Sequence, residues 1–116
     1  MKQTSFLLML VVLLTSAARA ETHTLIDIPT AWKLMAVERL SERFPGGKLQ
    51  EIGSTTDASE IISICGRMLT GGRSVPFYLM MFPGDPPTLM PIVGGTTEDI
   101  AEQVRSICSN AALPLD

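Results

Sequence analysis

The chain has 116 residues, of which 46% are apolar and 18% are charged, so it has room for one domain and is too apolar to be disordered. Nine basic and twelve acidic side chains give a formal charge of −3. Because an acidic surface repels phosphate groups, nucleic acid and anionic membrane surfaces are disfavoured as partners.

The first twenty residues have the organisation of an export signal. Lys2 precedes a nine-residue apolar run, Phe6 to Leu14, and the segment ends in the small-residue pattern Ala18-Arg19-Ala20. The run is about half the ~20 residues that a permanent membrane helix needs. We therefore expect residues 1–20 to be a cleaved signal peptide rather than a membrane anchor. Residues 21–116, with a formal charge of −5, would then be a periplasmic or secreted domain without a permanent membrane span.

In residues 21–116, the spacing of the apolar residues and the Gly/Pro clusters between apolar segments predict four strands and three helices. The expected strands are Thr24–Ile28, Lys48–Ile52, Phe77–Phe82 and Thr88–Val93. The last belongs at a sheet edge, because it contains a proline, which has no backbone N–H. The expected helices begin near Thr30, near Asp57 and near Thr96 or Thr97. The order β-α-β-α-β-β-α predicts an α/β fold, a three-layer sandwich on a four-stranded mixed sheet.

The middle helix is predicted from a capping box and from apolar residues at helical spacing. Asp57 and Glu60 have the spacing of a capping box, and Gly71-Gly72 would end the helix. The apolar residues between them that recur at helical spacing are Ile61, Ile64, Cys65, Met68 and Leu69. In this order helices interleave with strands, and an antiparallel hairpin precedes the last helix.

Three stretches of the chain resemble the thioredoxin superfamily. Leu25–Ile28 followed by Ala31-Trp32 is similar to that family's first core strand and the aromatic residue before its active site. Arg73–Phe82 is similar to the approach to its cis-proline strand, and Gly94-Gly95 ends the edge strand before the last helix. The resemblance implies a thioredoxin-like domain over residues 21–116. It does not imply dithiol chemistry, because no Cys-x-x-Cys pair follows Trp32.

The resemblance also implies a peptide-binding edge. Pro76 falls where the family has its cis-proline, and Val75 falls where the preceding backbone binds an extended peptide. Together with Trp32, these residues are the candidate peptide-binding site. An ordinary trans proline that opens a strand is the alternative.

Cys65 and Cys108 are the two cysteines of the chain. In an oxidising compartment an even number of cysteines favours a disulfide, and closing this loop would add about 4 kcal/mol. The alternatives are two buried free thiols or a reactive Cys65 beside Arg67. A regular thioredoxin arrangement puts the two cysteine-bearing helices on opposite faces of the sheet. A Cys65–Cys108 bond is incompatible with this arrangement, because the two Cα atoms would be too far apart.

No group of residues points to catalysis or to a resident cofactor. His23 is the only histidine, and one histidine cannot form a zinc site or a His-dependent nucleophile–base pair. We therefore predict no catalytic residue, no cofactor and no structural metal. After cleavage behind Ala20, His23 would be the third residue and can chelate Cu(II) with the terminal amine. A loose terminal histidine is the alternative.

These patterns favour an exported non-catalytic module that binds an extended protein segment in the cell envelope, as a chaperone-like or assembly accessory. One alternative is a small disulfide-stapled inhibitor or structural adaptor with an unrelated α/β fold. The other is a weak thiol-disulfide oxidoreductase that uses Cys65. The missing Cys-x-x-Cys motif argues against an enzyme.

Overall fold

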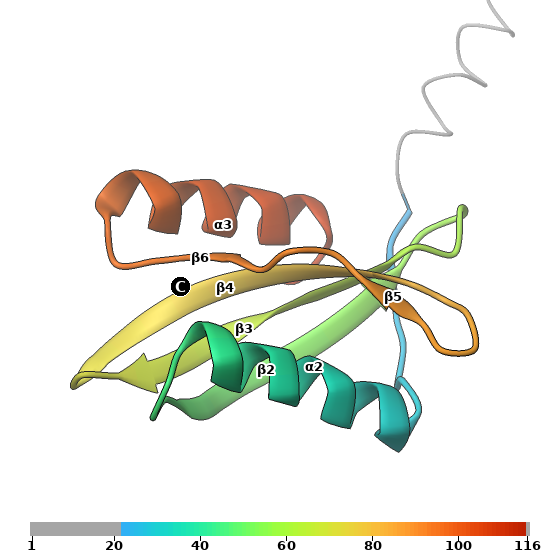
Figure 1. The fold of residues 1–116 in the computed structure, drawn as a ribbon. Coiled ribbons are helices and arrows are strands. Elements are labelled where there is room, and N and C mark those ends of the chain that lie inside the picture. Colours follow the sequence, from blue (N-terminus) through green and yellow to red (C-terminus); the bar gives the residue numbers. More distant parts are fainter. Residues whose placement is uncertain (1–21, 116) are drawn as a thin grey trace, which may run out of the picture.

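The computed structural model describes residues 22–115, so the expected signal peptide, residues 1–20, lies outside the described range. The strands are β1 (Thr24–Leu25), β2 (Lys48–Thr56), β3 (Ile62–Thr70), β4 (Arg73–Phe82), β5 (Thr88–Leu89) and β6 (Val93–Gly94). The helices are α2 (Thr30–Arg43) and α3 (Glu98–Asn110). The sheet lies between them, with α2 on one face and α3 on the other (Figure 1).

The six-stranded sheet is antiparallel throughout. Its order is β1-β2-β3-β4-β5, and β6 pairs with β4 beside β5. The predicted fold class, a thioredoxin-like sandwich on a four-stranded mixed sheet, is therefore wrong. Strands β2, β3 and β4 follow one another through short turns, so no crossover helix connects them and no parallel pair arises.

The error lies in the segment that was expected to be the middle helix, because Ile62–Thr70 form strand β3. Their apolar residues fit a two-residue repeat as well as a helical one. In the strand, Ile62, Ile64 and Met68 face α2. Cys65 faces the opposite way, toward α3. Because both faces of β3 are covered, apolar residues occur on both faces. In the sequence, their spacing therefore resembles that of the apolar face of an amphipathic helix.

The expected capping box forms a turn instead of a helix start. The Asp57 carboxylate accepts hydrogen bonds from the Ser59 backbone N–H at 2.9 Å and from its hydroxyl at 2.7 Å. These bonds lower the pKa of Asp57, and the bond from the Ser59 hydroxyl has the larger effect. Glu60 has φ 65°, in the left-handed region, and cannot occupy the first turn of a helix there.

The other expected elements are present with changed boundaries. The first and last helices are confirmed as α2 and α3. Phe77–Phe82 is confirmed as strand, in β4, which pairs with β3 on one side and with β5 and β6 on the other. The expected edge strand Thr88–Val93 is divided into β5 and β6, with Pro91 between them. β1 is shorter than expected and pairs with β2.

The two layers of core differ in size. The core between α2 and the sheet contains the buried residues Ile28, Ala36, Leu40, Phe44, Ile62, Ile64, Met68, Val75, Phe77, Leu79 and Met81. The core between α3 and the sheet has Cys65, Val104 and Cys108 as its buried members. The α3 layer thus has fewer buried apolar side chains to hold it.

Gly66 lies where β2, β3 and β4 approach most closely. A Cβ atom at this position would overlap the carbonyl oxygen of Glu51 in β2 and lie 2.7 Å from Cζ of Phe77 in β4. Because one obstacle is backbone and the other a buried ring, neither can move aside cheaply. The register of β2 on β3 therefore requires glycine at this position.

Replacing Gly66 by alanine tests this register. We expect Gly66→Ala to lower the free energy of unfolding by about 3 kcal/mol, the upper end of the cost of overpacking, in a urea titration. The matched control is Gly95→Ala, whose Cβ would meet only side-chain atoms of Ile100 at 3.4 Å or more. The control should stay within about 0.5 kcal/mol of the parent. Equal unfolding midpoints for the two variants would contradict the register.

Candidate functional site

The residues expected to bind a peptide do not come together. Val75 and Pro76 are buried in β4, and Trp32 lies half-buried in the first turn of α2. The Pro76 carbonyl oxygen and the Phe44 ring both approach Gly94, which places Pro76 near the C-terminal end of α2. Trp32 is near the other end of that helix, about 18 Å away at a rise of ~1.5 Å per residue.

Pro76 also has no free strand edge beside it. The cis peptide bond within residues 22–115 is Asp85–Pro86, so the Val75–Pro76 bond is trans. β4 is paired on both sides, with Pro76 opposite Arg67 of β3. β6 pairs with Phe77 and Tyr78 and stops short of Pro76. The missing N–H of this proline is tolerated at that interruption of the ladder.

The predicted disulfide is confirmed, and it joins a strand to a helix. Cys65 of β3 is bonded to Cys108 of α3, with Cα atoms 6.0 Å apart. Cys65 is 2% exposed and Cys108 is fully buried. The expected conflict between this bond and the fold is resolved because Cys65 lies on a strand and faces α3. With both sulfurs bonded, neither a pair of free thiols nor a reactive free thiol at Cys65 is present.

The structure instead presents a free backbone edge on β2. β1 pairs with Thr55 and Thr56, and the Ile26 N–H donates to the Ser54 carbonyl at 3.1 Å. Within residues 22–115, no strand pairs with that side of β2 from Lys48 to Gly53. Alternate residues of a strand direct their backbone groups to opposite sides. Ile52, two residues before Ser54, therefore points its N–H and C=O toward the free edge.

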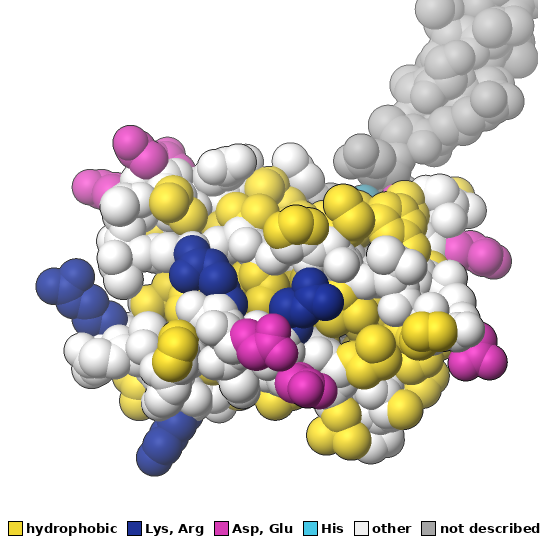
Figure 2. All heavy atoms as spheres, viewed as in Figure 1, with side chains coloured by type: hydrophobic (Ala, Val, Ile, Leu, Met, Phe, Trp, Pro, Cys, Tyr) yellow, Lys and Arg dark blue, Asp and Glu magenta, His cyan; other side chains and the backbone are white. Residues whose placement is uncertain are grey.

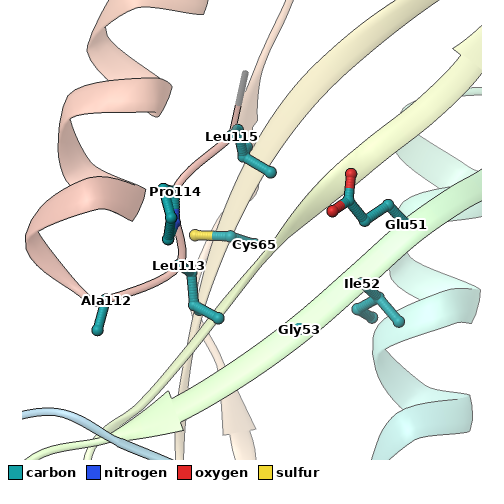
Figure 3. Close-up of a pocket in the computed structure, with 8 residues that line it drawn as sticks. All are labelled: Glu51, Ile52, Gly53, Cys65, Ala112, Leu113, Pro114 and Leu115. Atoms are coloured by element: carbon teal, nitrogen blue, oxygen red, sulfur yellow. The ribbon is translucent and has the colours of Figure 1, made fainter.

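One pocket borders this edge on the α3 face, and we call it the tail pocket. It forms between the C-terminal segment Ala112–Leu115 and residues Glu51, Ile52 and Gly53 of β2 (Figure 3). Cys65 contributes to its wall, and its sulfur points toward Leu113 and Pro114 in Figure 3. The cavity measures about 150 Å³, which suits a single side chain or a small molecule.

Hydrogen bonds hold the C-terminal segment in place on both sides of the tail pocket. The Thr55 hydroxyl donates to the Ala111 carbonyl at 2.6 Å. The Leu113 N–H donates to the Cys108 carbonyl at 2.7 Å. A Cβ on Gly53 would lie 3.0 Å from a methyl group of Leu113, so glycine at this position keeps the pocket open. The pocket is therefore preformed.

A second pocket borders the same residues on the α2 face, and we call it the isoleucine pocket. Its apolar lining consists of Leu25 and four isoleucines, and its cavity measures about 180 Å³. The isoleucines are Ile26, Ile28, Ile52 and Ile64. Asp27 and Lys33 contribute its charged groups. The edge at Ile52 and Gly53 thus has one small pocket above the sheet and another below it.

Two ion pairs flank the pockets, and their carboxylates are the more exposed members. Asp27 lies 3.8 Å from Lys33 and is 96% exposed against 46% for the lysine. Glu51 lies 3.8 Å from Arg67 and is 55% exposed against 26% for the arginine. Pairs this exposed contribute little stability. On the side of the molecule that Figure 2 shows, with α2, β5 and β6 in front, acidic and basic side chains lie side by side.

The described residues contain no cluster suited to a metal. No three His, Cys, Asp or Glu side chains are grouped as ligands within residues 22–115. The Cu(II) chelate considered for His23 involves residue 21, which lies outside that range. Of the helices described, none is long and apolar enough to cross a membrane. No family model, curated protein or solved structure matches the chain.

Sequence reasoning missed Ile52 and Gly53 as site residues although it expected strand at Lys48–Ile52. A strand pattern shows which residues are extended, but it does not show which neighbours they have. The signal that remains in retrospect is Gly53, because a glycine inside a strand often marks a close approach.

Removing the disulfide tests how far it holds the α3 layer. The bond closes a loop of 43 residues. We expect the double variant Cys65→Ala/Cys108→Ala to lose about 4 kcal/mol of unfolding free energy in urea, since its unfolded chain is less restricted. The reference is the parent protein under identical non-reducing conditions. A loss below about 1 kcal/mol would show that the small α3 core suffices without the bond.

Proposed function

We propose that this protein is a disulfide-stapled binding module that takes up an extended segment of another protein as a strand beside β2. The observation that supports this most directly is the free backbone of Ile52 with a pocket on each face of the sheet. Strand addition uses main-chain hydrogen bonds for affinity and pockets for alternate side chains for specificity. In the cell envelope, the compartment expected from the sequence, such a module acts as an adaptor or assembly accessory.

The pockets define the chemistry of the segment. A residue placed opposite Ile52 projects to the α2 face, where the isoleucine pocket accepts an apolar side chain. Its neighbours along the added strand project to the α3 face, beside Glu51 and the tail pocket. The exposed carboxylates of Asp27 and Glu51 favour basic side chains close by. The occupant is therefore an extended segment in which an apolar residue is followed or preceded by Lys or Arg.

A second copy of this chain fits the edge poorly. A twofold axis centred on Ile52 would bring the second strand opposite Ser54, whose carbonyl already accepts the Ile26 N–H. A twofold axis centred on Glu51 would put two carboxylates directly opposite each other, which is destabilising. A segment of a different protein avoids both problems.

The bonded cysteines also weigh against the oxidoreductase alternative. A thiol-disulfide exchange enzyme needs a thiolate as its nucleophile. Cys65 and Cys108 are bonded to each other and buried, so neither presents a thiolate that could attack a protein substrate. The adaptor alternative, with a disulfide staple and an unrelated α/β fold, fits the observed architecture better than a thioredoxin-like module does.

A random decapeptide library displayed on phage tests the proposal against the full chain. Ile52→Pro removes the N–H at the free edge and leaves the β2–β3 ladder in place, because Ile52 points away from β3. Ile52→Val, which keeps the N–H, is the matched control. We expect selected peptides to carry an apolar residue next to Lys or Arg. We expect them to bind Ile52→Pro about tenfold more weakly than the control, or ~1.4 kcal/mol, in titration calorimetry.

A second pair of variants separates pocket from backbone. Gly53→Val narrows the tail pocket without removing a donor, whereas Gly95→Val adds the same atoms beside Ile100, away from the edge. The first should weaken the same peptides and the second should not. Thermal unfolding of all variants confirms that each is folded. If no peptide is enriched, or if Ile52→Pro binds as well as Ile52→Val, the strand-addition proposal fails.

A further inference from the structure

The two sulfurs of the disulfide differ in what surrounds them. Cys65 lines the tail pocket, whereas Cys108 does not. The Cys108 sulfur lies 3.9 Å from the Phe77 carbonyl oxygen, against the backbone of β4. Both residues are buried, Cys65 at 2% exposure and Cys108 at 0%, so the lining of the tail pocket and not exposure distinguishes them. A small molecule in the tail pocket therefore meets the Cys65 sulfur first (Figure 3).

We infer that Cys65 is a thiolation site at which a small aliphatic thiol, admitted by the tail pocket, opens the disulfide. Thiol exchange proceeds by attack of a thiolate on one sulfur of a disulfide, and access selects which sulfur is attacked. A cavity of about 150 Å³ admits a small thiol and excludes the active site of a folded protein. This inference does not depend on the proposed binding of an extended segment.

The reaction is an exchange without net oxidation. The thiolate of the small thiol attacks the Cys65 sulfur, a new S–S bond forms there, and the Cys65–Cys108 bond breaks. The Cys108 sulfur leaves with the electron pair of that bond and takes a proton from solvent. One disulfide and one thiol are consumed, and one mixed disulfide and one thiol are produced.

The C-terminal segment controls access to the sulfur. Leu113 is half-buried over the pocket and packs against the α3 core. Its backbone N–H is fixed on the Cys108 carbonyl, so its side chain is the movable part of the cover. After exchange, the adduct on Cys65 occupies the tail pocket and α3 loses its covalent link to β3. The modification therefore loosens the α3 layer while leaving the larger α2 core untouched.

To test this, the native full-length domain is treated with 2-mercaptoethanol, and the reaction is quenched with acid at early times. Free thiols are then blocked with N-ethylmaleimide, and the modification of each cysteine is identified by peptide mass spectrometry. We expect the mercaptoethanol adduct on Cys65 and the maleimide on Cys108. An adduct on Cys108, or equal amounts on both cysteines, would overturn the inference. Equal amounts are the signature of exchange through global unfolding, in which both sulfurs are exposed alike.

Matched leucine variants test the cover. Leu113→Ala widens the approach to Cys65, whereas Leu34→Ala removes the same atoms from the exposed side of α2. We expect Leu113→Ala to raise the exchange rate about fivefold or more with the adduct still on Cys65, since access limits the reaction. Leu34→Ala should leave the rate unchanged. Identical rates for both variants would contradict the role of the tail pocket.

Discussion

Strand β3 is covered on both faces, and its two-residue alternation places the other layers. Ile64 and Met68 pack toward α2, while Cys65, between them in sequence, is bonded to α3. Gly66 allows β2 and β4 to close in on either side of the strand. A one-residue shift of register would send Cys65 into the α2 core and the apolar residues to the smaller α3 layer. The helices, the disulfide and the position of the β2 edge all depend on that register.

One ambiguity separated the predicted architecture from the observed one. Local spacing of apolar residues predicts the helices α2 and α3 and the strand at Phe77–Phe82. The even number of cysteines predicts the disulfide. Both signals are present in the sequence. Residues 61–69 satisfy helical and extended repeats alike, because a strand buried on both faces lacks clean alternation. Taking them as a helix forces a crossover and a mixed sheet, whereas a strand there gives an antiparallel meander. Tertiary burial, which no local pattern encodes, decides between the two.

The site was harder to predict than the fold, because it depends on which segments of the chain lie beside β2 in space. The edge at Ile52 is free because β1 ends at Leu25 and Ile26 makes the last bond, to Ser54. The tail pocket exists because the Thr55 hydroxyl holds Ala111 over β2. The peptide-binding residues implied by the family resemblance belong to a different topology, and in this one Val75 and Pro76 are interior members of β4. Edge and pockets together give the protein a place for an extended partner segment.

β3 is the inner strand of a meander whose β2 edge is open around Ile52. Amide hydrogen exchange resolved by residue with NMR measures both parts at once. We expect slow exchange for the β3 amides and for Gly53, whose N–H points to β3, and fast exchange for Ile52 between protected neighbours. Protection of Ile52 equal to that of Gly53, or a helical pattern of protection over residues 61–69, would contradict it.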